Sequence, residues 1–245
     1  MGRSGPRSCS SPTACRKRAL VSEGGEVARR TSPFSSLNAR SAHLSPGVYG
    51  IIDTHVTPDP LALLAALLRA EIRTVQLRAK AGVDRDLVRA MLLRTRAANA
   101  VLVINDDLDA ALQADGWHAG QEDLIGRDLA AIRLRLGTRL LGISCGTPGE
   151  ALQAQAAGAD YVGTGPFAAT GTKADAGPAI GRAGIAAVVR AVAIPVVAIG
   201  GIELGNIAEV AASGARMAAV VSAIARAPDP ELAARALQGA WSASG

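Results

Sequence analysis

The feature that most constrains the fold is an alternation of short β-branched runs with Ala- and Leu-rich stretches of helical spacing, repeated eight times after Pro46. The runs span residues 48–53, 74–78, 101–105, 116–120, 140–144, 161–165, 195–200 and 218–222. Strands that alternate with helices in this way form βαβ units and a parallel sheet. Eight such units close naturally into a barrel. The sequence therefore predicts an α/β protein whose folded part is a single (β/α)8 TIM barrel domain.

An open, doubly wound sheet is the alternative architecture for the same alternation. Its dinucleotide-binding form uses glycines in the first turn from strand to helix. Here that turn, residues 53–58, reads Asp-Thr-His-Val-Thr-Pro and contains no glycine. The chain is 49% hydrophobic but only 2% aromatic, so its core is aliphatic, which suits parallel strands covered by helices. The missing glycines favour the closed barrel, and the aliphatic core agrees with a parallel sheet.

The net charge of +5 has its source in residues 1–47. That segment holds eight of the 26 Lys and Arg residues but only two of the 21 acidic ones, so residues 48–245 are nearly balanced. The segment is rich in Ser, Arg, Gly and Pro and has no apolar periodicity, which predicts a disordered basic extension ahead of a barrel domain at 48–245. An organelle transit peptide and an extension without function both remain open. No nucleic-acid partner is expected.

Cysteine usage and hydropathy indicate a cytoplasmic protein. Cys9 and Cys15 lie in the extension, which leaves Cys145 alone in the barrel and excludes a disulfide framework. No apolar run approaches the roughly 20 residues of a membrane span, and no secretory signal is present. No membrane partner is therefore expected, and a homo-oligomer remains open.

Basic residues gather at the end of the second predicted strand, and strand ends are where such barrels place their active sites. Gln76, Arg78 and Lys80 alternate along the chain and therefore face the same side. Because barrel interiors favour apolar side chains, this cluster indicates a bound anion or ligand. The alternative is that the two cations lie on the rim and pair with nearby carboxylates.

Acidic clusters end the third and fourth predicted strands, at residues 105–107 and 120–123. Adjacent strand ends can bring two carboxylates face to face, and Mg²⁺ takes only a few oxygen ligands from protein when it binds phosphates. Asp106 and Asp123 are the predicted Mg²⁺ ligands. The competing explanation is that Asp106 or Asp107, and Asp123, cap the helices that follow.

The later strand ends carry hydroxyl groups and glycines. Ser144 and Thr147 follow the fifth strand and can bind phosphate or cap the next helix, with capping favoured for Thr147. Residues 166–173 form a long polar loop of the kind that closes over ligands. Residues 200–201 and 221–222 end strands seven and eight, where many such barrels bind a phosphate through backbone N–H groups.

Within the fourth strand, Trp117 and His118 are interpreted as packing residues. His55 follows the first strand, and the sequence assigns no function to it. No nucleophile–base arrangement and no zinc-type spacing occurs in the sequence.

These segments, in this order, resemble the thiamine phosphate synthase family. The resemblance extends from Tyr49 to about Ala240. It rests on residues 76–80 (QLRAK), 104–107 (INDD), 120–123 (GQED), 158–163 (GADYVG), 170–173 (TGTK), 198–202 (AIGGI) and 221–224 (VSAI). Three departures occur: Gly146 replaces a common His, residues 168–169 replace a bulky residue and Pro, and residues 216–217 replace an Asp-Gly pair. Arg216 would thereby add charge near the phosphate site.

The resemblance implies a Mg²⁺-dependent transferase that joins a pyrimidine-methyl diphosphate to a thiazole or carboxythiazole phosphate. The diphosphate substrate would bind to Gln76, Leu77, Arg78, Ala79, Lys80, Asn105, Ser144 and Lys173. The catalytic residues would be Arg78, Lys80, Lys173 and Ser144. The thiazole phosphate would bind to Thr170, Gly171, Thr172, Gly201, Val221 and Ser222. Diphosphate would leave first, and the thiazole nitrogen would then capture the pyrimidine cation without a protein nucleophile.

Two other functions are compatible with parts of the pattern. A related barrel, the thiazole tautomerase, shares the arginine-lysine strand and the Asn-Asp motif but resembles this chain less at residues 120–123. Asp123 is therefore the residue that discriminates between the two. A non-catalytic phosphate-binding barrel is the third reading, because a fold alone does not assign a function.

Overall fold

The computed structural model describes residues 1, 40–171 and 177–244. Its parallel strands form a closed barrel in which each pairs with the next and the eighth with the first. They are β1 (Gly47–Asp53), β2 (Thr74–Arg78), β3 (Val101–Asn105), β4 (Gly116–Ala119), β5 (Leu140–Cys145), β6 (Tyr161–Thr164), β7 (Val196–Ile199) and β8 (Met217–Val220). The predicted TIM barrel is confirmed, and no predicted strand end is displaced by more than two residues.

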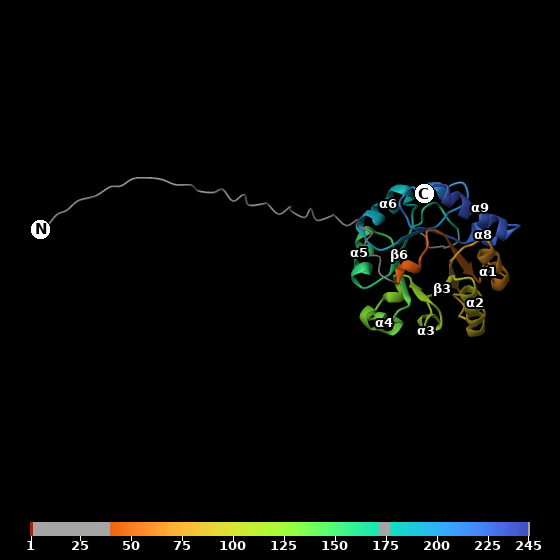
Figure 1. Cartoon of the computed structure of the whole chain (residues 1–245), viewed down its shortest axis with the longest axis horizontal. Coiled ribbons are helices and arrows are strands. Elements are labelled where there is room, and N and C mark those ends of the chain that lie inside the picture. The colour runs from red at the N-terminus through yellow and green to blue at the C-terminus, as the bar shows by residue number, and fades with distance from the viewer. Residues whose placement is uncertain (2–39, 172–176, 245) are drawn as a thin grey trace, which may run out of the picture. The chain divides into compact units, whose positions relative to one another are not determined.

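The helices form a ring around the strands (Figure 1). They are α1 (Pro60–Arg69), α2 (Arg85–Ala97), α3 (Leu108–Ala111), α4 (Leu129–Leu136), α5 (Pro148–Ala156), α6 (Gly181–Ala191), α7 (Ile207–Ala211), α8 (Ser222–Ala225) and α9 (Pro230–Ser242), with 3-10 turns η1 (Ser41–His43) and η2 (Glu122–Leu124). Side chains such as Leu64, Leu77 and Trp117 fill the layer between strands and helices. Trp117 is therefore a packing residue, as predicted.

A second, smaller core fills the barrel itself. It contains residues from most of the strands, among them Tyr49, Val103, Tyr161 and Met217. Because side chains alternate along a strand, each strand supplies one set of residues to this interior and the other set to the outer layer. The interior is mostly apolar, which makes the few polar groups inside it informative.

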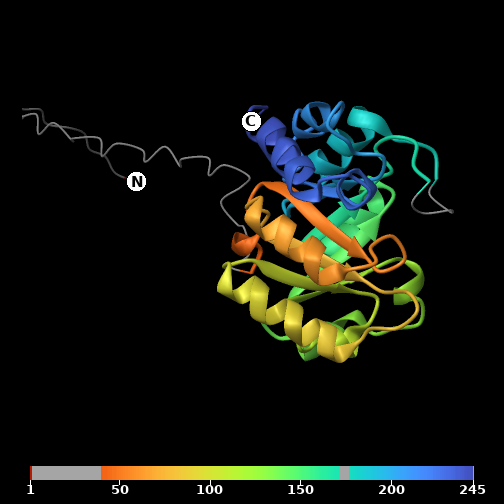
Figure 2. The same ribbon diagram turned by 90° about the vertical axis from the view of Figure 1, so that its right-hand side faces the viewer.

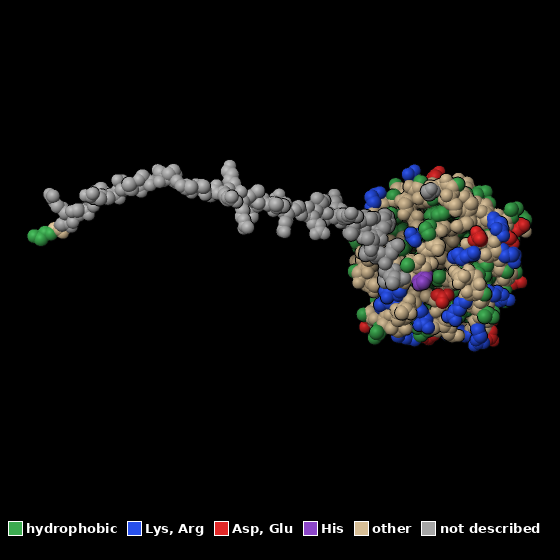
Figure 3. Space-filling view, in the orientation of Figure 1, with side chains coloured by type: hydrophobic (Ala, Val, Ile, Leu, Met, Phe, Trp, Pro, Cys, Tyr) green, Lys and Arg blue, Asp and Glu red, His purple; other side chains and the backbone are tan. Residues whose placement is uncertain are grey.

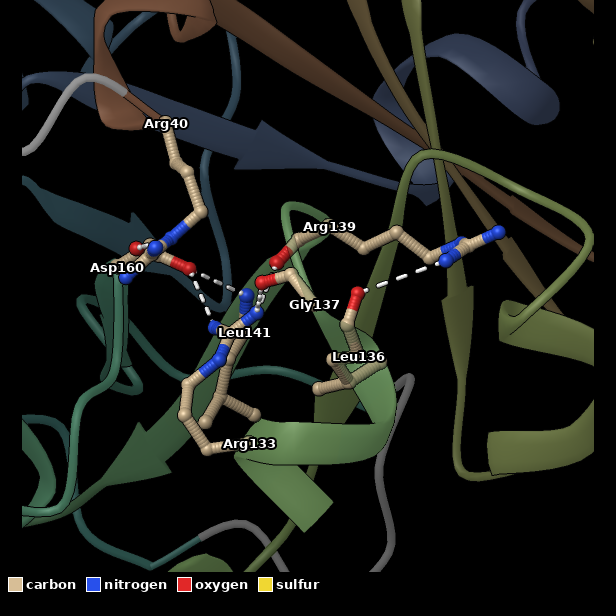
Figure 4. A network of polar contacts seen from close by, with 7 residues as sticks. All are labelled: Arg40, Arg133, Leu136, Gly137, Arg139, Leu141 and Asp160. Carbon is tan, nitrogen blue, oxygen red and sulfur yellow. Dashed lines mark hydrogen bonds and ion pairs between the residues drawn. The ribbon is translucent and has the colours of Figure 1, made fainter.

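The amino end of the barrel is closed by residues that the sequence assigned to the disordered extension. The segment at residues 40–44, which includes η1, lies against that end (Figure 2). Leu44 is fully buried. Arg40 Nε donates to Asp160 Oδ1 at 2.8 Å, and Asp160 Oδ2 accepts from Arg133 Nη1 at 2.8 Å (Figure 4). Arg216 Nε donates to the Leu44 carbonyl at 3.0 Å. Residues 40–44, which the sequence assigned to the extension, are thus packed against the barrel.

A deletion series tests this packing. Removing residues 1–45 is expected to lower the free energy of unfolding by about 3 kcal/mol or more, because it deletes buried Leu44 and leaves the buried Asp160 without one of its partners. Removing only residues 1–39 is the matched control and is expected to leave both stability and steady-state kinetics unchanged. Urea unfolding followed by circular dichroism measures the difference. Equal stability of the two truncations would contradict the assignment.

Charged side chains of both signs are interspersed on the face shown in Figure 3. Neither sign of charge occupies that face alone. Within the described part of the chain, no helix has the length and hydropathy needed to cross a membrane.

Candidate active site

A cavity of about 340 Å³ opens at the carboxyl ends of the strands, where barrels of this kind bind their ligands. Many of the predicted site residues line it: Gln76, Arg78, Lys80, Asn105, Asp106, Ser144, Thr170, Gly201, Val221 and Ser222. Residues predicted from strands two, three, five, seven and eight are thus brought together in one place.

The other predicted site residues lie elsewhere. The Leu77 side chain is fully buried in the layer between strands and helices and does not line the cavity. Ala79 lines a smaller pocket that adjoins the main cavity. Gly171 is exposed. Thr172 and Lys173 lie outside the described residues.

The basic cluster of β2 has the predicted orientation, since Gln76, Arg78 and Lys80 all line the cavity. Arg78 Nη1 donates to Asp53 Oδ2 at the end of β1, and the Asp53 side chain is only 3% exposed. Asp53 Oδ1 also accepts from the His55 backbone N–H at 2.9 Å. Arg78 is thus both a cavity residue and the partner of a carboxylate, which combines the two explanations that the sequence left open.

Asp106 and Asp123 face each other at the ends of β3 and β4. The pKa of Asp106 is raised to about 6, first by burial and then by a hydrogen bond and the charge of Asp123, while Lys80 and Arg78 act in the opposite direction. Two neighbouring carboxylates repel each other when both are ionised, so this pair favours either a shared proton or a cation.

Helix capping is performed by other residues. Asp107 caps α3 by accepting from the Ala110 N–H at 2.8 Å, and Asp128 caps α4. Asp123 instead accepts from the Gly120 N–H at 2.8 Å, within its own turn. The capping explanation therefore holds for Asp107 but not for Asp106 or Asp123. Thr147 caps α5, as predicted.

Ser144 contacts a histidine inside the barrel. Its Oγ lies 3.0 Å from His118 Nε2, and His118 lines the cavity, so the interpretation of His118 as packing alone is incomplete. Burial lowers the pKa of His118 to about 4, against the opposing charge of Asp123, so the imidazole is neutral near pH 7. Burial raises the pKa of the neighbouring Cys145 thiol to about 12, with a further contribution from Glu150. The thiol is therefore no nucleophile.

The opposite side of the cavity is built from backbone turns. Gly201 has a φ of +65°, and a Cβ at this position would lie 2.7 Å from the carbonyl oxygens of Ala168 and Ala169. The Ala168 N–H donates to the Gly200 carbonyl at 3.0 Å, which fixes the loop after β6 to the end of β7. Glycine is thus required at residue 201 by backbone conformation and by close approach.

Arg216 does not lie near this side of the cavity. It precedes β8, and its contact with the Leu44 carbonyl places it at the amino end of the barrel. The expectation that it adds charge near a phosphate site is wrong, because residues at the two ends of one strand face opposite ends of the barrel.

Four residues of the site were missed or undervalued from the sequence: Asp53, Tyr49, Tyr161 and His118. The two tyrosines line the cavity and lie within hydrogen-bonding distance of each other, with the hydroxyl oxygens 3.1 Å apart. Side chains alternate along β4 and Trp117 faces the helices, so this alternation could have predicted that His118 faces the barrel interior. No local signal identifies Asp53 as the partner of Arg78, because the pairing depends on strand register.

The fold and its cavity define a (β/α)8 barrel of the class that binds small ligands at the carboxyl ends of its strands. The family model described as thiamine monophosphate synthase matches residues 48–224. The thiamine-phosphate synthase of Herpetosiphon aurantiacus is 46% identical over 195 residues, which cover 77% of this chain and 93% of that protein. The chain belongs to the thiamine monophosphate synthase family.

Two further comparisons agree with this assignment. The thiamine-phosphate synthase of Moorella thermoacetica is 46% identical over 184 residues, covering 73% of this chain and 86% of that protein. The solved structure of a thiamine phosphate pyrophosphorylase from Pyrococcus furiosus superimposes with a TM-score of 0.75 at 30% identity, covering 84% of this chain and 99% of that one.

Proposed function

We propose that the chain joins a pyrimidine-methyl diphosphate to a thiazole phosphate in this cavity, with the two substrates at opposite sides. By its family the chain is an enzyme, a transferase that makes thiamine phosphate. The placement of the substrates rests on one observation: the two sides of the cavity differ in their chemical groups. Cations and carboxylates come from β2 and β3, whereas glycine backbone and hydroxyl groups come from β7 and β8.

The diphosphate end of the first substrate fits the charged side. Arg78 and Lys80 supply positive charge, and Asn105 supplies an amide that can donate to phosphate oxygens. Preorganised cations stabilise the negative charge that develops on a departing diphosphate more than they stabilise the bound substrate. Lys173 would add a further cation, and this assignment stays a prediction because the residue lies outside the described part of the chain.

The carboxylates of Asp106 and Asp123 fit a Mg²⁺ ion. Burial and then the proximity of Asp123 raise the pKa of Asp106, and a cation between the two carboxylates would relieve their repulsion. Among the described residues no group of three or more His, Cys, Asp or Glu side chains could hold a metal. Two protein carboxylates suit Mg²⁺ that takes its other ligands from water and a substrate diphosphate. When bound, Mg²⁺ would neutralise charge on that diphosphate.

The reaction in this proposal needs no covalent intermediate with the protein. The bond between the methylene carbon and the diphosphate oxygen breaks, and its electron pair leaves with diphosphate. The thiazole nitrogen lone pair then forms the new bond to the methylene carbon, which gives thiamine phosphate. The high pKa of Cys145 and the neutral imidazole of His118 agree with a site that binds and orients rather than attacks.

An assay of purified protein with both phosphorylated substrates and Mg²⁺ tests the proposal by measuring thiamine phosphate and diphosphate. Equal amounts of both products are expected, with no product when Mg²⁺ is removed by chelation. Substrate binding without any product would favour the non-catalytic barrel. A cytoplasmic location and a homo-oligomeric state stay predictions.

Ser222→Ala tests the placement of the thiazole phosphate. The Ser222 side chain lines the cavity at the end of β8, so its loss is expected to raise the KM for thiazole phosphate about fivefold and leave the KM for the pyrimidine substrate unchanged. Steady-state kinetics with each substrate varied in turn provide the measurement. Gly201→Val would be a poorer test, because the new side chain would collide with the loop after β6. A rise in the pyrimidine KM alone would count against the placement.

A further inference from the structure

A chain of hydrogen bonds between four buried side chains and the half-buried Ser144 crosses the barrel along the cavity. Gln76 Nε2 donates to Tyr49 Oη at 3.1 Å, and Tyr49 Oη lies 3.1 Å from Tyr161 Oη. Tyr161 Oη lies 3.0 Å from His118 Nδ1, and His118 Nε2 lies 3.0 Å from Ser144 Oγ. The five residues belong to β2, β1, β6, β4 and β5, and all of them line the cavity. The two tyrosines of this chain of bonds are the only two in the sequence.

Two glycines leave room for these side chains. Gly142 lies on β5 between its register partners His118 and Tyr161. A Cβ at Gly142 would overlap Tyr161 Oη and lie 2.5 Å from His118 Nδ1, in the middle of their hydrogen bond. A Cβ at Gly163 would lie 3.2 Å from His118 Cε1. The backbone therefore leaves space for these hydrogen-bonded side chains. A residue larger than glycine at position 142 would break the hydrogen bond between Tyr161 and His118.

The direction of the hydrogen bonds follows from the donor at one end and from the acceptors available to the buried hydroxyls. Tyr49 Oη accepts from Gln76, and among the described residues Tyr161 Oη is the one side-chain acceptor within reach of the buried Tyr49 proton, so Tyr49 donates to Tyr161. Tyr161 in turn donates to His118 Nδ1. A neutral imidazole whose Nδ1 accepts carries its proton on Nε2, so His118 donates to Ser144 Oγ. The Ser144 proton is then directed to an acceptor other than His118.

We infer that Tyr49, Tyr161 and His118 are positioning residues that hold Ser144 as a hydrogen-bond donor toward an acceptor atom of the pyrimidine diphosphate. The inference rests on the proposed function, in which Ser144 contacts that substrate. The opposite direction would make Ser144 donate to His118 and would present only oxygen lone pairs to the substrate. Because lone pairs repel an acceptor atom, the direction set at Gln76 decides whether Ser144 attracts or repels it.

Nitrogen-15 NMR of protein labelled at histidine measures this direction, because a protonated and a bare imidazole nitrogen resonate at well separated positions. The sequence has three histidines, and His43 and His55 are exposed. The variants His43→Gln and His55→Gln therefore assign the remaining signals to His118. We expect the proton of neutral His118 on Nε2. A proton on Nδ1 would overturn the inference, and the experiment needs no substrate.

Tyr161→Phe tests the effect on catalysis, because it removes the central hydroxyl and keeps the ring. We expect kcat/KM for the pyrimidine diphosphate to fall about tenfold, an unchanged KM for thiazole phosphate, and loss of the Nε2–H preference of His118. Thr164→Val is the matched control in β6. It deletes a buried hydroxyl that has no hydrogen-bond partner among the described residues, and it should change none of these quantities.

A double-mutant cycle separates positioning from simple destabilisation. If Tyr161 acts through Ser144, adding Tyr161→Phe to Ser144→Ala should cost almost nothing further in kcat/KM. Losses that multiply independently would overturn the inference. An unmodified protein that makes no thiamine phosphate would reject the proposed function, while the NMR result would still decide the direction of the hydrogen bonds.

Discussion

Arg78→Ala is expected to lower kcat about a hundredfold and to change the KM for thiazole phosphate little. The guanidinium lines the charged side of the cavity, where the proposed reaction develops negative charge on the leaving diphosphate. Removing one preorganised donor to such a charge typically costs about a hundredfold or more in kcat. Steady-state kinetics with each substrate varied in turn would show the loss in kcat.

The pairing with Asp53 adds a second consequence to this substitution. Arg78→Ala leaves a carboxylate whose side chain is 3% exposed without its cation, so part of any loss could come from a destabilised or displaced β1. Arg78→Ala combined with Asp53→Asn removes that uncompensated charge, and Asn can still accept from the His55 N–H. We expect the double variant to recover stability but not kcat. Recovery of both would mean that Arg78 has only a structural role.

The sequence predicted the barrel well because strands and helices are encoded locally. β-Branched runs mark strands, and a capping residue such as Thr147 marks the start of a helix, without reference to the rest of the chain. Alternation along β2 then placed Gln76 and Arg78 on the cavity side.

The parts that could not be predicted depend on closure of the barrel. The Tyr49 to Tyr161 contact joins residues 112 positions apart, and the Arg40 to Asp160 ion pair spans 120 positions. Neither pair has a local pattern. Residues 40–44 are also too few to show a periodicity, so their polar composition resembled the extension that precedes them. Only the closed barrel makes Leu44 a buried residue.

The resemblance and the residues agreed on Asp106 and Asp123, but the sequence could not separate a ligand from a helix cap. The structure shows which of the acids at these strand ends caps a helix. Asp107 accepts from the first turn of α3, whereas Asp106 and Asp123 interact with each other. Asp123→Asn and Asp107→Asn are therefore a matched pair of variants for testing the metal site, because each removes one negative charge.

Asp123→Asn is expected to raise the Mg²⁺ concentration for half-maximal activity about tenfold or more, with partial rescue of rate at high Mg²⁺. The substitution removes a charge that a cation would need, and the amide oxygen can still accept from the Gly120 N–H, so the turn should keep its shape. Circular dichroism would confirm that the fold is retained.

Asp107→Asn is the control for Asp123→Asn, because it removes one nearby charge from a residue that caps α3, and Asn caps a helix as well as Asp. Its Mg²⁺ dependence should match that of the unmodified protein. Asp106→Asn should behave like Asp123→Asn, since either change leaves a single carboxylate where Mg²⁺ would need two. Titration of activity against Mg²⁺ for the three variants gives the comparison. If Asp123→Asn and Asp107→Asn showed the same Mg²⁺ dependence, the carboxylate pair would not be the metal site, and the raised pKa of Asp106 would then indicate a shared proton instead.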